Sequence, residues 1–295
     1  MKQQKSFGTH TTGTLYLVPT PIGNLGDMTN RSIQVMQDVD VIAAEDTRHT
    51  QQLLNQFEIT TKQISFHEHN KETRIPELVA RLQAGDSIAQ VSDAGMPSIS
   101  DPGHELVKAA ILADVPVVPI PGASAGITAL IASGLAPQPF MFYGFLPRKP
   151  KEQLHELDLL KTHQETMIFY EAPHRLAKTL QSVEKVFGAE RQVVLARELT
   201  KRYEEFLRGT IAELVAWATS NEVRGEFVVI VSGNDQVIET SDADPLAELS
   251  AVDAVKELVE NGLKPTAAIK QIAKQRSLDR QTLYLKYQGE NKQWL

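Results

Sequence analysis

The stretch that decides the fold is Val91-Ser92-Asp93-Ala94-Gly95-Met96-Pro97-Ser98-Ile99-Ser100-Asp101-Pro102-Gly103. It follows an apolar run from Ser87 to Val91, typical of a buried strand, and precedes a helical pattern from Glu105 to Leu112. The stretch is therefore a loop at the carboxyl end of a strand, where open α/β sheets bind their ligands. Its excess of glycine, proline, carboxylate and hydroxyl groups favours a ligand-binding loop. For its Asp-Pro-Gly end, the simpler interpretation is that Asp101 caps the next helix.

Strands and helices alternate in the same way on both sides of this loop. Apolar strands are expected over residues 14–18, 39–44, 64–66 and 116–120, with helices between them. Such alternation predicts a mostly parallel sheet that is covered by helices on both faces. The α/β rhythm repeats over 140–231, where residues 205–209 are expected to form an edge strand.

These patterns also predict the organisation of the chain. We expect a flexible leader over residues 1–12, an N-terminal α/β domain over 13–121 and a C-terminal α/β domain over 122–233. A polar, acidic linker is predicted over 234–245, followed by a helical, helix-turn-helix-like extension over 246–295. A small packing bundle with a solvated charged face explains this last segment equally well.

Composition narrows the class of protein. The 295-residue chain contains no cysteine, which excludes disulfides and thiolate sites. It shows no signal peptide and no apolar run of ~18 residues, so we expect a cytoplasmic protein without membrane contact. The net charge of −7 argues mildly against nucleic acid, and no DNA partner is expected. The segment from Lys264 to Lys292 is locally basic, with seven Lys or Arg against Asp279 and Glu290.

Several common kinds of site do not match the sequence. The turn containing Gly23 and Gly26 lacks the G-x-G-x-x-G spacing of dinucleotide-binding loops, and neither a phosphate-binding P-loop nor G-x-S-x-G is present. His67 and His69 share one face of an extended chain, as a zinc ligand pair would, but no third ligand is evident. We therefore expect no metal site.

Acidic and polar residues gather where the predicted strands end. Glu45 and Asp46 follow the second strand, His67 follows the third and Asp93 the fourth. Because these ends line one edge of a sheet, their side chains can converge on a cleft, bind a ligand or remove a proton. Ordinary salt bridges or helix capping explain each residue taken alone.

Six motifs occur in order along the chain, namely Leu17–Thr29, Ala44–Arg48, Phe66–His69, Val91–Gly103, Pro121–Ala125 and Phe169–Arg175. Together they resemble the ribosomal RNA small subunit methyltransferase I family of the tetrapyrrole-methylase superfamily. The resemblance runs from about residue 13 to 231, and the tail resembles the helix-turn-helix extension of that family. Six motifs in one order are far more specific than any one of them.

The resemblance implies a fold and a reaction. The fold class is α/β, with two α/β domains of the tetrapyrrole-methylase type that bind S-adenosyl-L-methionine in a cleft between them. The implied reaction is methyl transfer to the ribose 2′-hydroxyl of a cytidine in the decoding region of 16S rRNA. The substrate is expected to be the assembled small ribosomal subunit, and the enzyme a homodimer.

Site residues follow from the matching positions. The resemblance places at the cofactor Asp93, Gly95, Met96, Ser98, Ser124, Ala125, Tyr170, Glu171, Ala172, Ala196, Arg197, Gly225 and Glu226. The substrate side is expected to include Pro21, Gly23, Arg48, Arg148, Lys149 and Lys201. A ribose hydroxyl is a poor nucleophile while protonated, so a base is expected. Candidates, from their strand-end positions, are Glu45, Asp46, His67 and Asp101.

Two other functions compete with this one. A porphyrin or corrin methylase has the same fold and cofactor, but the first turn lacks the expected Gly-rich form and the basic tail has no evident role there. A nucleic-acid-binding regulator built on the C-terminal helices leaves the strand-end motifs without a purpose.

Overall fold

The computed structural model describes residues 1–8, 10–235, 249–276 and 278–291. Contacts divide the chain into one unit over Met1–Asn234 and another over Asp235–Leu295. The predicted boundary at residue 121 lies inside the first unit and stays a prediction. Most of the predicted acidic linker, and Lys292 in the tail, lie outside the described residues.

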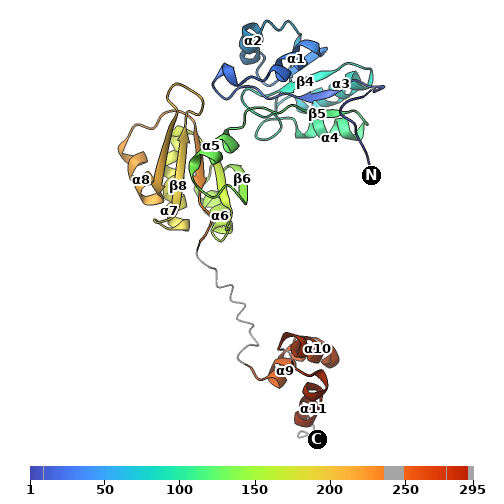
Figure 1. The fold of residues 1–295 in the computed structure, drawn as a ribbon, viewed down its shortest axis with the longest axis vertical. Helices are drawn as coiled ribbons and strands as arrows, with labels where there is room; N and C mark the ends of the chain where they lie inside the picture. The colour runs from blue at the N-terminus through green and yellow to red at the C-terminus, as the bar shows by residue number, and fades with distance from the viewer. Residues whose placement is uncertain (9, 236–248, 277, 292–295) are drawn as a thin grey trace. The chain divides into compact units, whose positions relative to one another are not determined.

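The first sheet is parallel throughout, as the strand–helix alternation predicts (Figure 1). Its strands have the order β3-β2-β4-β1-β5. Their bounds are β1 (Leu15–Leu17), β2 (Val41–Ala44), β3 (Gln63–Ser65), β4 (Ile88–Val91) and β5 (Val117–Pro119). The carboxyl ends of these strands therefore meet at one edge of the sheet.

Helices cover both faces of the first sheet. They are α1 (Asn30–Asp38), α2 (Thr47–Gln56), α3 (Lys71–Gln83) and α4 (His104–Leu112), with a 3₁₀ turn, η1, at Leu25–Asp27. Met36 of α1 and Leu54 of α2 belong to one buried cluster, whereas Leu78 of α3 and Leu106 of α4 belong to another. Each helix buries one apolar face against the sheet, which is the main source of stability for short helices.

The second sheet is mixed rather than parallel, although its sequence shows the same α/β rhythm. Its order is β6-β7-β10-β8-β9, and only β6 and β7 are parallel neighbours. The strands are β6 (Phe140–Phe145), β7 (Thr166–Glu171), β8 (Gln192–Arg197), β9 (Glu205–Thr210) and β10 (Phe227–Val231). The connection from β8 to β9 is too short for a crossover helix, so these strands form a hairpin. The predicted edge strand is confirmed as β9.

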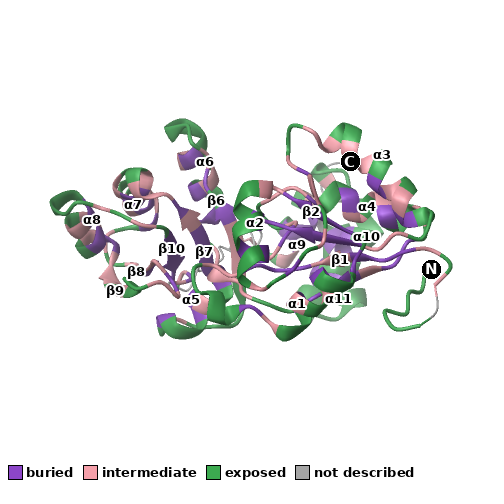
Figure 2. Ribbon diagram, turned by 90° about the horizontal axis from the view of Figure 1, so that it is seen from above, coloured by how far each residue is buried: buried purple, intermediate pink, exposed green. Residues whose placement is uncertain are grey.

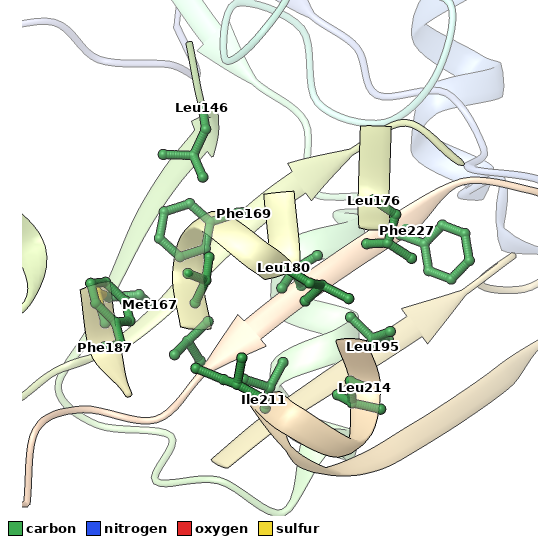
Figure 3. Packing of buried hydrophobic residues seen from close by; sticks show 14 of the residues in the cluster. Leu146, Met167, Phe169, Leu176, Leu180, Phe187, Leu195, Ile211, Leu214 and Phe227 are labelled. Atoms are coloured by element: carbon green, nitrogen blue, oxygen red, sulfur yellow. The ribbon is translucent and has the colours of Figure 1, made fainter. Parts of the chain in front are cut away.

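The core of this second sheet lies on both of its faces. On one face α6 (Pro150–Leu160), α7 (Pro173–Phe187) and α8 (Ile211–Ser220) pack around Phe169, Leu180 and Leu195 (Figure 3). On the other face α5 (Ala125–Ser133) buries Ala129 and Leu130 against the strands. Figure 2 shows β10 buried and the outer helix faces exposed, as expected for a sheet covered on both sides.

The C-terminal unit contains α9 (Ala251–Glu260), α10 (Pro265–Gln275) and α11 (Arg280–Asn291). These helices share their own buried cluster, which includes Val255, Ile269, Ile272 and Leu283. The predicted helices of the tail are therefore confirmed. None of the helices in the described part of the chain has the length and apolar character needed to cross a membrane.

The N-terminal leader contacts the open edge of the first sheet. The Gln4 side-chain amide donates to the Val117 carbonyl (2.8 Å), and its oxygen accepts the Val117 N–H (2.9 Å). Lys2 pairs with Asp114 at 2.7 Å. A side chain from the leader thus satisfies a backbone donor and acceptor of the edge strand β5.

Candidate functional site

The loop from Ser92 to Gly103 is fixed to the loop that follows β1. The Thr20 N–H donates to the Gly95 carbonyl (3.1 Å), and the Gly95 N–H donates to the Thr20 carbonyl (3.0 Å). Gly95 has φ +77°, a conformation that favours glycine. An added Cβ there would lie 3.3 Å from Ile22 Cγ2. The absence of a side chain at Gly95 therefore lets the two loops approach closely.

The side chain of Gln90 fixes the other end of this loop. It is fully buried in β4, and its amide donates to the Pro102 carbonyl (2.7 Å) and to Ser98 Oγ (3.3 Å). Ser98 has φ +67°, which is unusual for a residue with a side chain. A buried glutamine inside an apolar strand is visible in the sequence, but sequence reasoning did not identify it as a loop support.

The structure brings together the side chains of Glu45, Asp93 and Asp101 from two strand ends. Burial raises the pKa of Glu45 to about 6, and the charges of Asp101 and Asp93 add to the effect. Burial also raises the pKa of Asp101, against a hydrogen bond from Ser92 that lowers it. The Asp46 N–H donates to Asp93 Oδ1 at 3.1 Å. Within the described residues, none of these three carboxylates has a cationic partner.

The start of α5 and Tyr170 lie beside this acidic group. The Gly126 N–H donates to the Tyr170 hydroxyl at 3.1 Å. Ser124, the N-cap residue of α5, makes no capping hydrogen bond with its side chain. Burial raises the pKa of Tyr170, and the charge of Asp101 raises it further. Asp101 thus interacts electrostatically with both Asp93 and Tyr170, which places these two predicted residues near one another.

Asp46 and His67, two of the candidate bases, differ in how their side chains are held. Asp46 is the N-cap of α2, accepts the Arg48 N–H (2.8 Å) and pairs with the Arg48 guanidinium (3.0 Å). The Arg48 hydrogen bonds lower the pKa of Asp46 to about 2, so it is a weak base. His67 donates its backbone N–H to Asn70 Oδ1 (2.9 Å), and its buried Nδ1 has no partner in the described part of the chain.

Glu171 is turned into the second sheet's core. Its carboxylate accepts the Thr179 hydroxyl (2.6 Å) and the Ala172 N–H (2.8 Å), and it pairs with Arg175 Nε (3.3 Å). Arg175 in turn donates to the carbonyl of Leu146 at 3.0 Å. The hydrogen-bonding groups of the Glu171 side chain are therefore satisfied without a ligand. Its predicted contact with the cofactor can then be made only by its backbone.

Arg197, Lys201 and Glu226 form ion pairs after β8. Lys201 Nζ lies 3.0 Å from Glu198 Oε1 and 2.8 Å from Glu226 Oε2. Arg197 pairs with Glu205 at 3.2 Å and donates to the Arg224 carbonyl at 2.7 Å. Lys201 is therefore shared between Glu198 and Glu226, and Glu198 also accepts the Glu226 N–H at 2.9 Å.

A close approach at Gly23 connects the two halves of the first unit, and a second one at Gly225 lies within the second half. A Cβ on Gly23 would lie 2.5 Å from Lys201 Cγ, so the turn after β1 packs against the Lys201 chain. A Cβ on Gly225 would lie 2.5 Å from Glu198 Cγ. These contacts put Gly23 and Lys201, both predicted for the substrate side, against each other.

The remaining predicted residues lie in the two connected loops, at the start of α7, in β8 and before α6. Met96 and Pro21 are partly exposed in the two connected loops, Ala172 is the N-cap of α7 and Ala196 is buried in β8. Arg148 and Lys149 are exposed before α6, away from any ion pair except that of Lys149 with Glu152 (2.8 Å) in the described chain.

Two hollows on the first unit lie apart from the acidic group. One, of about 880 Å³, borders β3 and includes the cations Arg48, Lys62 and Arg74. The other, of about 380 Å³, lies between the end of α5 and β9. Neither is lined by Glu45, Asp93 or Asp101, and no group of three or more His, Cys, Asp or Glu in the described ranges has the arrangement of a metal site.

The structure is similar to solved methyltransferases at low sequence identity. The methyltransferase CobJ superposes with a TM-score of 0.58 and 17% identity, covering 75% of this chain and 95% of that one. A uroporphyrin-III C-methyltransferase from Thermus thermophilus, solved with S-adenosylhomocysteine, gives 0.54 and 17%, covering 75% and 97%. These likenesses show the shared fold.

Sequence similarity is much closer to proteins named ribosomal RNA small subunit methyltransferase I. The protein of that name from Streptococcus pyogenes serotype M3 is 54% identical over 288 residues, which is 97% of this chain and 99% of the relative. The Bacillus subtilis protein is 48% identical over 97% of this chain and 98% of its own length. The family model for tetrapyrrole (corrin/porphyrin) methylases matches residues 14–215. The chain therefore belongs to the tetrapyrrole methylases and, within them, to the ribosomal RNA small subunit methyltransferase I family.

Proposed function

We propose that the protein is an S-adenosylmethionine-dependent methyltransferase that modifies 16S rRNA in the small ribosomal subunit. The acceptor is the ribose 2′-hydroxyl of a cytidine in the decoding region, and the substrate is the assembled subunit in the cytoplasm. The observation that carries this proposal is the unpaired acidic group of Glu45, Asp93 and Asp101 beside the open start of α5. A carboxylate without a cation is free to accept the proton of a hydroxyl.

The residues at this edge fit the cofactor. When bound, S-adenosylmethionine supplies an electrophilic methyl group on a positively charged sulfur. The uncapped N-terminus of α5 suits its carboxylate, because helix N-termini bind anions. Gly95 and Gly122 let the loops around this site pack closely. A side chain at Gly95 would meet Ile22, and one at Gly122 would meet Pro19. The neighbouring carboxylates favour a cation.

Glu45 is the best candidate for the base. A general base works best when its pKa lies near the operating pH, and that of Glu45 is about 6. Asp46, by contrast, is held by Arg48 and caps α2. Glu45 accepts the hydroxyl proton as the oxygen attacks, and the protein then contributes chiefly by holding the oxygen in line with the methyl group.

The reaction is tested by offering three acceptors with radiolabelled S-adenosylmethionine: small subunits, naked 16S rRNA and a tetrapyrrole. We expect label in the subunits alone. The labelled nucleotide should resist alkaline cleavage at its 3′ phosphodiester, because a methylated 2′-hydroxyl cannot attack it. Label in the tetrapyrrole would instead establish the competing methylase, and alkali-sensitive label would refute the ribose position.

Binding to the subunit requires cations on an acidic protein. We propose that Arg148, Lys149 and Lys151 and the basic helices of the tail supply them. Lys264, Lys270, Lys274 and Lys286 all lie in the second unit, on or beside α10 and α11, and their residues are exposed. Truncation after Asn234 removes this unit as a whole. We expect weaker subunit binding and a shallower dependence on salt concentration. Unchanged binding across the salt series would exclude the tail from this role.

The active form is proposed to be a homodimer. In support, Ile127 and Ile131, one helical turn apart on α5, are 43% and 76% exposed, and neighbouring exposed apolar side chains are typical of an interaction surface. Light scattering over a series of protein concentrations should give twice the chain mass of 32.7 kDa. A single-chain mass at all concentrations would refute the dimer.

A further inference from the structure

The loop that joins β8 to β9 has a fixed and strained shape. Glu198 and Thr200 have φ +50° and +65°, although neither is glycine. The Thr200 N–H donates to Glu204 Oε2 (2.6 Å), and the Glu204 N–H donates to the Lys201 carbonyl (3.1 Å). Backbone strain of this kind persists only where the surroundings impose it, and it is concentrated at functional sites.

The acidic residues of this loop are already bound to partners. Glu198 pairs with Lys201, Glu204 accepts the Thr200 N–H, and Glu205 pairs with Arg197 at 3.2 Å. Arg202, in contrast, has no carboxylate partner in the described portion of the chain. The loop therefore presents one cation that its own acids do not neutralise.

Arg202 and Tyr203 stand together at the tip of the loop. The Tyr203 residue is 69% exposed, and the Arg202 guanidinium carbon lies 5.7 Å from the centre of its ring. Lys201, the preceding residue, packs against Gly23 in the turn after β1. The pair is thus carried by a rigid loop, next to the residues proposed to border the acceptor side.

We propose that Arg202 and Tyr203 form a platform on which an unpaired base of the small-subunit rRNA stacks. This inference rests on the proposed function, because it names a contact that the RNA substrate makes. Single-stranded RNA is bound by exposed aromatic rings and guanidinium planes, since every base offers a flat π face. The neighbouring carboxylates are already engaged, Glu204 by the Thr200 N–H and Glu205 by Arg197, so Arg202 is the charge of the loop that is left to attract RNA phosphates.

The test compares Tyr203→Ala with Tyr203→Phe in full-length protein. Affinity for purified small subunits is measured by co-sedimentation over a series of protein concentrations with S-adenosylhomocysteine present. We expect Tyr203→Ala to weaken binding about tenfold, which corresponds to ~1.4 kcal/mol. Tyr203→Phe, which keeps the ring, should stay within about twofold of the unaltered protein.

A matched control is available near the N-terminus. Phe7 is 80% exposed and lies 5.6 Å from the Arg31 guanidinium carbon, so it repeats the same pairing outside the site. Phe7→Ala should leave subunit binding unchanged. Calorimetry with S-adenosylhomocysteine should give equal affinity for all variants, which shows that each is folded.

The outcomes separate this inference from the proposed function. The platform is refuted if Tyr203→Ala binds subunits within twofold of the unaltered protein, or if Tyr203→Phe and Phe7→Ala lose as much affinity as Tyr203→Ala. If the unaltered protein binds subunits but transfers no methyl group to them, the proposed reaction fails while the platform is still judged by affinity. If the unaltered protein does not bind subunits at all, both fail.

Discussion

The loops at the strand ends of the two sheets form two edges, and these edges differ in how their charges are balanced. After the parallel first sheet, Glu45, Asp93 and Asp101 lie near one another, with no cation paired to them in the described chain. After the mixed second sheet, Glu171 is paired with Arg175, and Glu198 and Glu226 are paired with Lys201. Unpaired carboxylates are costly and reactive, whereas paired ones hold a shape.

This difference indicates a division of labour. The first sheet supplies groups with shifted pKa values, which are typical of chemistry, and the second supplies a stiff surface against which ligands are held. Removing a carboxylate should therefore have opposite effects at the two edges. Stability should fall when a paired acid is removed and rise when an unpaired one is neutralised.

The largest effect is expected on stability at the second edge. Glu171→Ala removes a buried carboxylate and leaves Arg175 and Thr179 without their acceptor. We expect the free energy of unfolding, measured by urea denaturation, to fall by about 3 kcal/mol. Glu205→Ala breaks an exposed pair and should change it by less than about 0.5 kcal/mol. Equal effects of the two changes would contradict the assignment of Glu171 to the core.

The next effect is expected on the rate of methyl transfer. Glu45→Gln keeps the size of the side chain but cannot accept a proton, so single-turnover methylation of small subunits should fall about 100-fold. Asp46→Asn is the control at the adjacent position, because asparagine also caps helices, and its rate should stay within about threefold. A Glu45→Gln rate within threefold of the unaltered protein would remove Glu45 as the base.

The pH dependence of the rate sharpens the same point. Since the pKa of Glu45 is about 6, the base is protonated below that pH. The single-turnover rate should fall about tenfold for each pH unit well below 6 and should level off above 7. In Glu45→Gln this acidic limb of the pH profile, the decrease of the rate below pH 6, should be absent. An unchanged limb in that variant would assign the titration to another group, Asp101 being the next candidate.

The smallest effect is a gain of stability in the same variant. Folding raises the pKa of Glu45 from 4.5 to about 6, so the native state holds the proton more tightly than the unfolded chain. The stabilisation from protonation is complete below pH 4.5 and is lost as the pH rises through about 6. After allowance for solvent, Glu45→Gln should be more stable by ~1 kcal/mol at pH 7, with no difference at pH 4. A destabilised variant at pH 7 would show that the Glu45 charge is compensated.

The sequence predicts the first sheet well because local rules suffice there. Apolar runs, helix patterns and Gly- or Pro-rich loops give parallel strands and put Glu45, Asp93 and Asp101 at one edge. The second sheet shows the limit of such rules. Its α/β rhythm does not reveal that β10 inserts between β7 and β8, because strand order depends on contacts between distant residues.

The sequence determines the contacts of individual side chains less directly than the positions of the strand ends. Glu171 lies within a family motif, yet its carboxylate is turned inward to Thr179 and Arg175, which the motif does not reveal. The contact of Gly23 with Lys201 depends on two loops, 178 positions apart in the sequence, that meet only in the folded chain. Neither the propensity nor the spacing of residues encodes such a contact.

The bond between Gln4 and Val117 has a consequence for handling the protein. A bare edge strand can add a strand from another molecule and so seed aggregation. The side-chain amide of Gln4 occupies both backbone groups of Val117, and Pro119 lacks a donor farther along the same strand. Shortened versions that start after the leader would lose this cover and become prone to intermolecular strand pairing, even with every residue of the acidic edge intact.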